Sequence, residues 1–183
     1  MGAAMKKPLY LIEHALLLVA LAGCITFAKG SNPPHPASIN SQDEPSDSPL
    51  AKLASCPVTP PNGSTPPGEQ PSALNHGNGA IWTELWPEGT VVFEPGGPGH
   101  IYADGSLEMK FPWWRGEGVR DPLSIEGHRL DAPSPPLRAD IPEGYGDTGF
   151  QASSITFPSE GCWQVTGSAG SASLTFVTRV IRK

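Results

Sequence analysis

Basic residues are scarce in this chain of 183 residues. It has 12 Lys and Arg against 18 Asp and Glu, which gives a formal net charge of −6. The basic residues that follow the first seven positions are spread along the sequence without clusters. Because Lys and Arg in number are needed to bind phosphate backbones, the composition argues against a nucleic-acid partner.

The sequence also lacks the common motifs of catalytic and cofactor sites. It has no GxSxG, HExxH or CxxC motif. Residues 94–99 (EPGGPG) are rich in glycine, but their prolines have no amide hydrogen to offer a phosphate. The histidines His76, His100 and His128 are scattered without ligand spacing. We therefore predict no catalytic residue, no metal site and no cofactor.

Helical periodicity is absent after the first 24 residues, and the chain contains 21 Gly and 22 Pro, which favour turns. Short runs instead alternate apolar and polar residues with the period of two that is typical of strands. The runs are residues 90–94, 107–113, 123–125, 137–141, 150–157, 162–166 and 173–181. The pattern predicts an all-β fold, a sandwich of about seven to nine short antiparallel strands over residues 76–183.

The start of the chain has the parts of a secretion signal. Apolar residues 9–21 follow two lysines and lead into residues 21–24 (LAGC). This segment resembles the lipobox of bacterial lipoprotein signal peptides. The resemblance implies that residues 1–23 are a signal peptide and that Cys24 carries lipid such as palmitate. The mature chain is then expected on the extracytoplasmic side of the cell membrane or the outer membrane. An uncleaved signal anchor and an ordinary signal peptide are the alternatives.

Residues 24–75 are rich in Pro and Ser and have no periodic apolar residues, so we expect a disordered linker. With the first cysteine carrying lipid, Cys56 and Cys162 remain. An even pair in an oxidising compartment predicts a disulfide. Trp163 and Val165 share one strand face, and if that face meets the core, Cys162 points outward. The bridge is then expected to pin the linker to the outside of the sandwich.

The C-terminal strands form a recognisable series. A strand over residues 150–157 is followed by a Phe-Pro-Ser-Glu-Gly turn, a Cys-Trp-Gln-Val strand, a Gly-rich hairpin over residues 167–170 and a long last strand. This order resembles the closing E, F and G strands of immunoglobulin-like domains. It is also similar to uncharacterised bacterial secreted and lipoprotein domains that end in a Gly-Cys-Trp-x-Val segment. The resemblance implies an immunoglobulin-like β-sandwich.

Tryptophans are the best candidates for a binding site: Trp82, Trp86, Trp113 and Trp114. Because neighbouring strand residues point to opposite faces, one ring of the Trp113-Trp114 pair is expected to face outward. An outward ring is able to stack on a sugar or on a partner side chain. The alternative is that the proline-rich segment packs over it.

These features predict a membrane-anchored lipoprotein that presents a β-sandwich as a binding or structural module. The expected partners are the membrane, through the lipid anchor, and a polysaccharide or an envelope protein. Acidic residues such as Asp104, Glu108, Glu126, Asp131 and Asp140 leave open a small envelope hydrolase acting on carbohydrate, which needs a pair of carboxyl groups. A metal-handling envelope protein is a further alternative.

Overall fold

The computed structural model describes residues 55–183. The predicted signal peptide, the predicted lipid-attachment residue Cys24 and the predicted linker up to residue 54 lie outside the described residues. Within the described part, no helix is long and apolar enough to cross a membrane.

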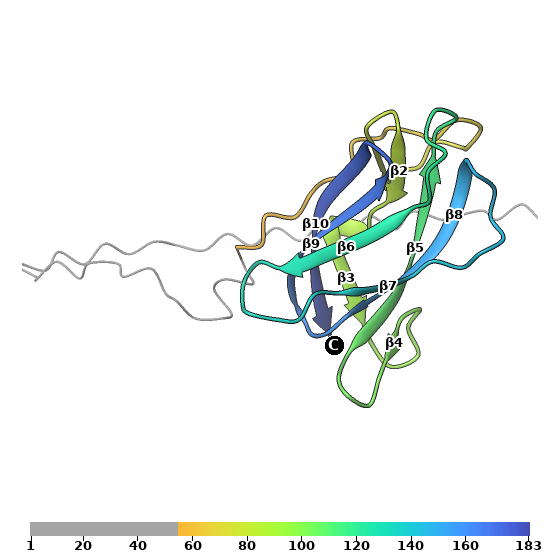
Figure 1. Cartoon of the computed structure of the whole chain (residues 1–183). Coiled ribbons are helices and arrows are strands. Elements are labelled where there is room, and N and C mark those ends of the chain that lie inside the picture. The colour runs from red at the N-terminus through yellow and green to blue at the C-terminus, as the bar shows by residue number, and fades with distance from the viewer. Residues whose placement is uncertain (1–54) are drawn as a thin grey trace, which may run out of the picture. The chain divides into compact units, whose positions relative to one another are not determined.

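Residues 55–183 form two packed β-sheets (Figure 1). The first sheet has the strand order β1-β2-β5-β8-β7, with β4 also paired to β5, and the second has the order β3-β10-β9-β6. The elements are β1 (Asn75–Gly77), β2 (Ile81–Glu84), the 3-10 helix η1 (Pro87–Gly89), β3 (Thr90–Phe93), β4 (His100–Ile101), β5 (Leu107–Arg115), β6 (Ser124–Arg129), β7 (Arg138–Asp140), β8 (Gly149–Phe157), β9 (Gly161–Ala169) and β10 (Ala172–Arg182).

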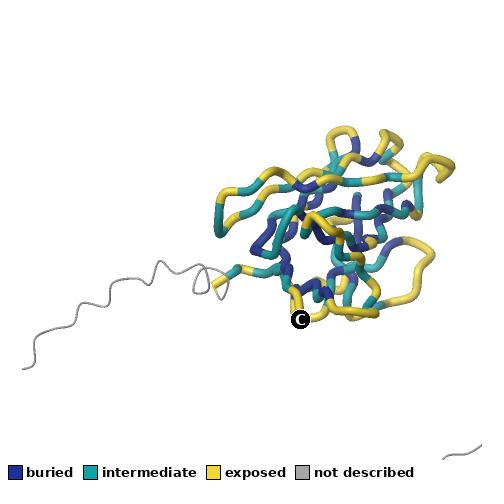
Figure 2. Tube along the Cα trace, turned by 90° about the horizontal axis from the view of Figure 1, so that it is seen from below, coloured by how far each residue is buried: buried dark blue, intermediate teal, exposed yellow. Residues whose placement is uncertain are grey.

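Alternation along the long strands separates the core face of each sheet from its outer face. In β5, Leu107, Met109, Phe111 and Trp113 are buried, and the residues between them are partly or fully exposed. The strands β8 and β10 follow the same pattern. The buried side chains form one hydrophobic cluster. Figure 2 shows buried segments toward the middle of the domain and exposed segments around its edge. The apolar positions of the predicted strands therefore build the core of a sandwich.

One strand is longer than the sequence predicts. The sequence predicts a turn over residues 167–170, but β9 continues to Ala169 and the chain turns at Gly170, whose φ is 57°. A Cβ atom on Gly167 would lie 2.3 Å from the Trp113 ring of the opposite sheet. The glycine therefore makes room for a large core side chain and does not mark the turn.

The direction of β3 corrects a second prediction. The sequence predicts antiparallel strands throughout, whereas β3 runs parallel to β10, with Val91 beside Val180. Alternation gives the face of each residue but not the direction of the neighbouring strand, so this pair was not predictable from the local pattern. The short strands β1, β2 and β4 were also absent from the predicted set.

A disulfide joins Cys56 to Cys162 of β9, with the two α-carbons 5.5 Å apart, which confirms the predicted pairing. Cys162 is only 1% exposed, yet it is not part of the core cluster that contains its neighbours Trp163 and Val165. Its side chain therefore lies on the outer side of β9. The bridge fastens the segment before β1 to the second sheet and does not join the two sheets to each other.

The disulfide begins a segment, residues 56–74, that we call the strap. The backbone N–H of Thr59 donates to the carbonyl oxygen of Val177 in β10 at 2.9 Å. The Asn62 side chain donates to the carbonyl oxygen of Gly77 in β1 at 2.7 Å and accepts the N–H of the same residue at 3.1 Å. The strap thus contacts strands of both sheets, and this part of the predicted linker follows the surface of the sandwich.

An ion pair lies beside the disulfide. Arg129 of β6 donates to both carboxylate oxygens of Asp131, at 2.8 and 3.1 Å, and Asp131 also accepts the backbone N–H of Cys162 at 3.0 Å. Burial is the largest influence on the Asp131 carboxyl group and acts to raise its pKa. The hydrogen bonds together outweigh burial and hold the pKa below its ordinary value. The ionised carboxylate therefore links the end of β6 to the bridged cysteine.

Replacing both bridged cysteines with serine is expected to lower the free energy of unfolding by about 4 kcal/mol. The reason is that the bridge closes a loop whose ends are 106 residues apart, which restricts the unfolded chain. Urea unfolding of the oxidised wild type and of the Cys56→Ser/Cys162→Ser double variant measures the difference. Reduced wild type is the control and should match the double variant. Equal stability of the oxidised wild type and the double variant would contradict this role.

Candidate functional site

A row of aromatic side chains crosses the outer face of the first sheet. In the register of the sheet, Trp82 of β2 lies beside Trp114 of β5, and Trp114 lies beside Phe150 of β8. Trp113 is fully buried in the core. Its neighbour Trp114 therefore faces outward, because successive strand residues alternate between faces.

The strap covers one end of this row. Trp82 is 5% exposed, and its indole Nε1 donates a hydrogen bond to the Ser64 hydroxyl in the strap at 3.0 Å. A Cβ atom on Gly77 would lie 2.0 Å from the Trp82 ring, so the glycine lets the indole lie against β1. The proline-rich segment thus covers one of the outward tryptophans.

The other end of the row is open to solvent. Phe150 is 43% exposed and Tyr145, in the β7–β8 loop, is 40% exposed. The ring centroid of Phe150 is 5.4 Å from that of Trp114 and 5.7 Å from that of Tyr145, and both pairs meet edge to face. Trp114 is partly buried, and its Nε1 donates to the Glu69 carboxylate of the strap at 3.1 Å. We call Trp114, Tyr145 and Phe150 the aromatic patch.

The four tryptophans selected from the sequence do not form one surface. Trp82 and Trp114 belong to the outer row, but Trp113 belongs to the core and has no exposed area. Trp86 follows β2 and is partly buried against the core cluster. Of the four, only Trp114 contributes to the open aromatic patch.

Two residues of the aromatic patch, Phe150 and Tyr145, are not among the candidates that the sequence predicts. Phe150 was identifiable from the alternation of β8, because it is out of phase with the buried residues Ile155 and Phe157. Tyr145 lies in a loop. No local pattern distinguishes it from any other loop tyrosine, so its position beside Phe150 depends on the folded loop.

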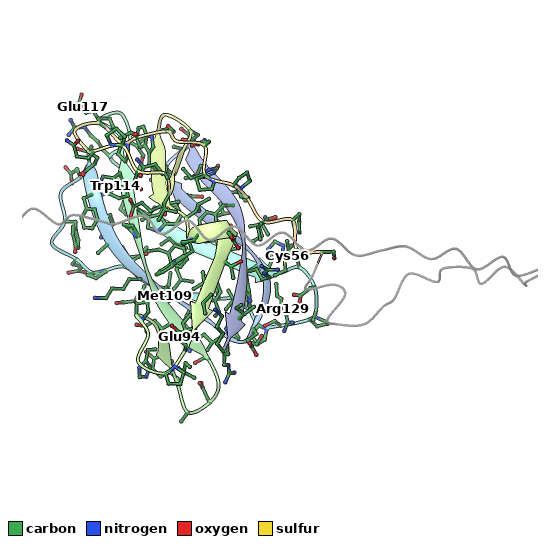
Figure 3. All side chains as sticks on the ribbon, turned by 180° about the vertical axis from the view of Figure 1, so that it is seen from behind. Cys56, Glu94, Met109, Trp114, Glu117 and Arg129 are labelled. Carbon is green, nitrogen blue, oxygen red and sulfur yellow. A yellow bond between two sulfur atoms is a disulfide. The ribbon has the colours of Figure 1, made fainter. Side chains whose placement is uncertain are left out.

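A pocket of about 290 Å³ opens at the end of the sandwich where the β5–β6 and β7–β8 loops lie. We call this cavity the loop-end pocket. Glu117 of the β5–β6 loop and Trp114 lie toward one end of the domain in Figure 3, and Glu94 lies toward the opposite end. Tyr145 lines the pocket and also belongs to the aromatic patch, so the two features adjoin. The other lining residues are Arg115, Arg120, Pro122, Leu123, Ile141, Pro142, Glu143, Gly144, Gly146, Asp147 and Gln151.

A buried arginine holds the two loops of the pocket together. Arg115, the last residue of β5, is 6% exposed. Its Nη1 donates to the carbonyl oxygen of Asp121 at 2.9 Å, and its Nη2 donates to the carbonyl oxygen of Gly146 at 2.6 Å. Gln151 of β8 is also buried and donates to the carbonyl oxygen of Pro142 at 3.1 Å. These donors fix the loop that carries Tyr145.

The carboxyl and imidazole groups with altered pKa values give no support to a hydrolytic site. Hydrogen bonds from the hydroxyl and the backbone N–H of Ser106 lower the pKa of Asp104, and Asp131 is held ionised beside Arg129. A general acid needs a raised pKa, so these two groups are unsuited to that role. Burial is the main cause that lowers the pKa of His76. Among the described residues, no group of three or more His, Cys, Asp or Glu side chains is placed to hold a metal ion.

Comparison with known proteins identifies no relative. No protein-family model, no curated protein and no solved structure matches this chain. The aromatic patch and the loop-end pocket are therefore the structural features that bear on function.

Replacing Arg115 with methionine is expected to lower the free energy of unfolding by about 2 kcal/mol, because two loop carbonyls lose a charged donor. Amide hydrogens of residues 141–147 should then exchange faster, which hydrogen-exchange mass spectrometry measures. Arg120→Met is the matched control: it changes an exposed arginine of the same pocket and should shift stability by less than about 0.5 kcal/mol. Unchanged exchange in the loop of the Arg115 variant would show that Arg115 does not hold it.

Proposed function

We propose that this chain is an extracytoplasmic lipoprotein, anchored through Cys24 to the cell membrane or the outer membrane, that binds an envelope polysaccharide at its aromatic patch. The observation that carries the binding proposal is the open end of the aromatic row. Two aromatic side chains are about 40% exposed there, while the other end of the row is covered by the chain's own strap. Clustered exposed apolar side chains mark interaction surfaces more often than isolated ones do.

The surroundings of the aromatic patch favour a saccharide as its ligand. The outer face of β8 continues from Phe150 through the partly exposed residues Ala152, Ser154 and Thr156. Rings next to hydroxyl groups suit a sugar, which presents an apolar ring face and polar edges. Binding sites for small ligands combine apolar walls with a few polar groups in this way.

We also propose that the sandwich is immunoglobulin-like, and its strand order supports this. The first sheet contains β2-β5-β8-β7 and the second contains β10-β9-β6. If β2, β5, β6, β7, β8, β9 and β10 are taken in chain order as strands A to G, the sheets are ABED and GFC. That is the arrangement of immunoglobulin constant-type domains. In such domains the loops cluster at the two ends of the sandwich, which is where the loop-end pocket lies.

The proposal of a lipid anchor is supported by residues 21–24 (LAGC) after an apolar segment. Removal of residues 1–23 lowers Lys+Arg from 12 to 10 and Asp+Glu from 18 to 17, so the mature charge is −7. Two or more acyl chains on one N-terminal cysteine are sufficient for stable anchoring.

Replacing Cys24 with serine is expected to abolish lipid attachment. Intact mass of the membrane-extracted wild type should show loss of residues 1–23 and the added mass of the acyl chains, and the variant should lack that added mass. Wild type that is recovered in the soluble fraction without added mass would indicate an ordinary signal peptide. Wild type and variant that both keep residues 1–23 and remain in the membrane would indicate a signal anchor.

Replacing Phe150 or Tyr145 with alanine is expected to weaken polysaccharide binding by about tenfold, since each loses an aromatic contact worth ~1.5 kcal/mol. Co-sedimentation with purified peptidoglycan and affinity electrophoresis in a panel of soluble polysaccharides measure the binding. Tyr102→Ala is the matched control, because Tyr102 is 39% exposed but belongs to the turn between β4 and β5.

Three outcomes would count against this assignment. Equal binding by wild type and both patch variants would show that the aromatic patch is not the site. Binding of the wild type to envelope proteins alone would replace the saccharide with a protein partner. Release of reducing ends from a polysaccharide by the wild type would indicate a hydrolase.

A further inference from the structure

Two arginines line the loop-end pocket of a chain whose net charge is negative. Arg115 is buried at the end of β5, and Arg120 is exposed in the β5–β6 loop. Exposed carboxylates of Glu143 and Asp147 line the same cavity, so its four charged side chains sum to no net charge. The cavity therefore offers both cationic donors and anionic acceptors to a ligand.

The guanidinium of Arg115 is incompletely satisfied. Of its five N–H groups, two account for the bonds to the carbonyl oxygens of Asp121 and Gly146. Its Nε atom is buried and has no hydrogen-bond partner, and none of the ion pairs among residues 55–183 includes it. Buried charges in proteins are normally paired, because the loss of hydration is costly. A carboxylate that enters the pocket would supply the missing counter-charge of Arg115 and would accept a charge-assisted hydrogen bond from the exposed Arg120.

We propose that the loop-end pocket is a subsite for the carboxylate of an acidic sugar, and that it makes the aromatic patch selective for saccharides that contain uronic acids. Arg120 donates hydrogen bonds to the carboxylate, and the buried guanidinium of Arg115 adds a second positive charge beside it. The carboxylates of Glu143 and Asp147 accept hydrogen bonds from sugar hydroxyls. The balanced lining suits one carboxylate on each sugar residue and disfavours a densely charged polymer such as polyphosphate. The inference rests on the proposed saccharide binding and names the class of saccharide.

Tyr145 connects the pocket to the aromatic patch. It lines the cavity, and its ring centroid is 5.7 Å from that of Phe150 on the outer face of β8. A saccharide that stacks on Phe150 and Tyr145 therefore has its neighbouring sugar residue at the mouth of the pocket. The volume of about 290 Å³ is at the lower end for small-ligand sites, which suits a single sugar residue.

The test compares polymers that differ only in the carboxyl group. The detergent-solubilised full protein is applied to immobilised polygalacturonate and alginate and to the same two polymers after chemical reduction of their carboxyl groups to alcohols. Wild type is expected to bind at least one acidic polymer about tenfold more tightly than its reduced counterpart, since one charge-assisted contact is lost. Arg120→Met should lower this preference, because the acidic polymer loses the exposed donor to its carboxylate.

Two further variants separate this subsite from the aromatic patch. Phe150→Ala should weaken binding to the acidic and reduced polymers by the same factor. Arg138→Met is the charge control, because Arg138 is exposed on β7 and does not line the pocket. It should leave the preference for the acidic polymer intact.

Equal affinity of the wild type for the acidic and reduced polymers would overturn the carboxylate subsite and leave the patch as a binder of neutral saccharides. If the Arg120→Met and Arg138→Met variants lose the preference for the acidic polymer equally, that preference comes from general charge attraction. This result would also overturn the carboxylate subsite. No binding to any of the four polymers would overturn the acidic-sugar inference. It would also contradict the proposed function if the Phe150 and Tyr145 variants bind purified peptidoglycan as tightly as wild type does.

Discussion

The antiparallel pairing of β5 with β8 determines the core and the outer surface together. The pairing extends from Leu107 beside Phe157 to Arg115 beside Gly149. Its register places Trp113 in the core and Trp114 on the outer face next to Phe150. A slip of one residue would exchange the two faces of β5, because the side-chain period of a strand is two. The apolar contacts of the core therefore also hold the exposed aromatic patch in place.

The strap determines how much of the aromatic row is exposed. Without it, Trp82 and Trp114 would both be exposed on the outer face of the sheet, in a row that ends with the contact of Trp114 and Phe150. Ser64 and Glu69 each accept the indole N–H of one tryptophan, so the strap satisfies polar atoms as it covers apolar area. The disulfide at Cys56 fixes the start of this segment to β9. A proline-rich sequence that could not form a core of its own thus completes the surface of one.

The long strands were predictable from the sequence because alternation over many residues is an unambiguous signal. The runs at residues 107–113, 150–157 and 173–181 correspond to β5, β8 and β10. By contrast, β2 has only four residues and reads Ile-Trp-Thr-Glu, with the first three all buried. The strap covers its outward residue Trp82, so this outward position is apolar as well. The sequence of β2 therefore shows no alternation of apolar and polar residues. The disulfide was predictable because an even number of cysteines remains after Cys24. The parallel pairing of β3 with β10 and the position of Tyr145 beside Phe150 depend on the assembled fold.

Arg115 is where the sequence departs from its own pattern. The inward positions of β5 are Leu107, Met109, Phe111 and Trp113, and the next inward position holds a charged residue that is 94% buried, since only 6% of it is exposed. An apolar residue there would avoid the loss of hydration that a buried guanidinium suffers, but it would leave the carbonyl oxygens of Asp121 and Gly146 without their donor. Departures from such local rules concentrate at functional sites. Here the departure has a visible effect, because the guanidinium binds both loops at one end of the sandwich and thereby holds Tyr145 between the aromatic patch and the pocket.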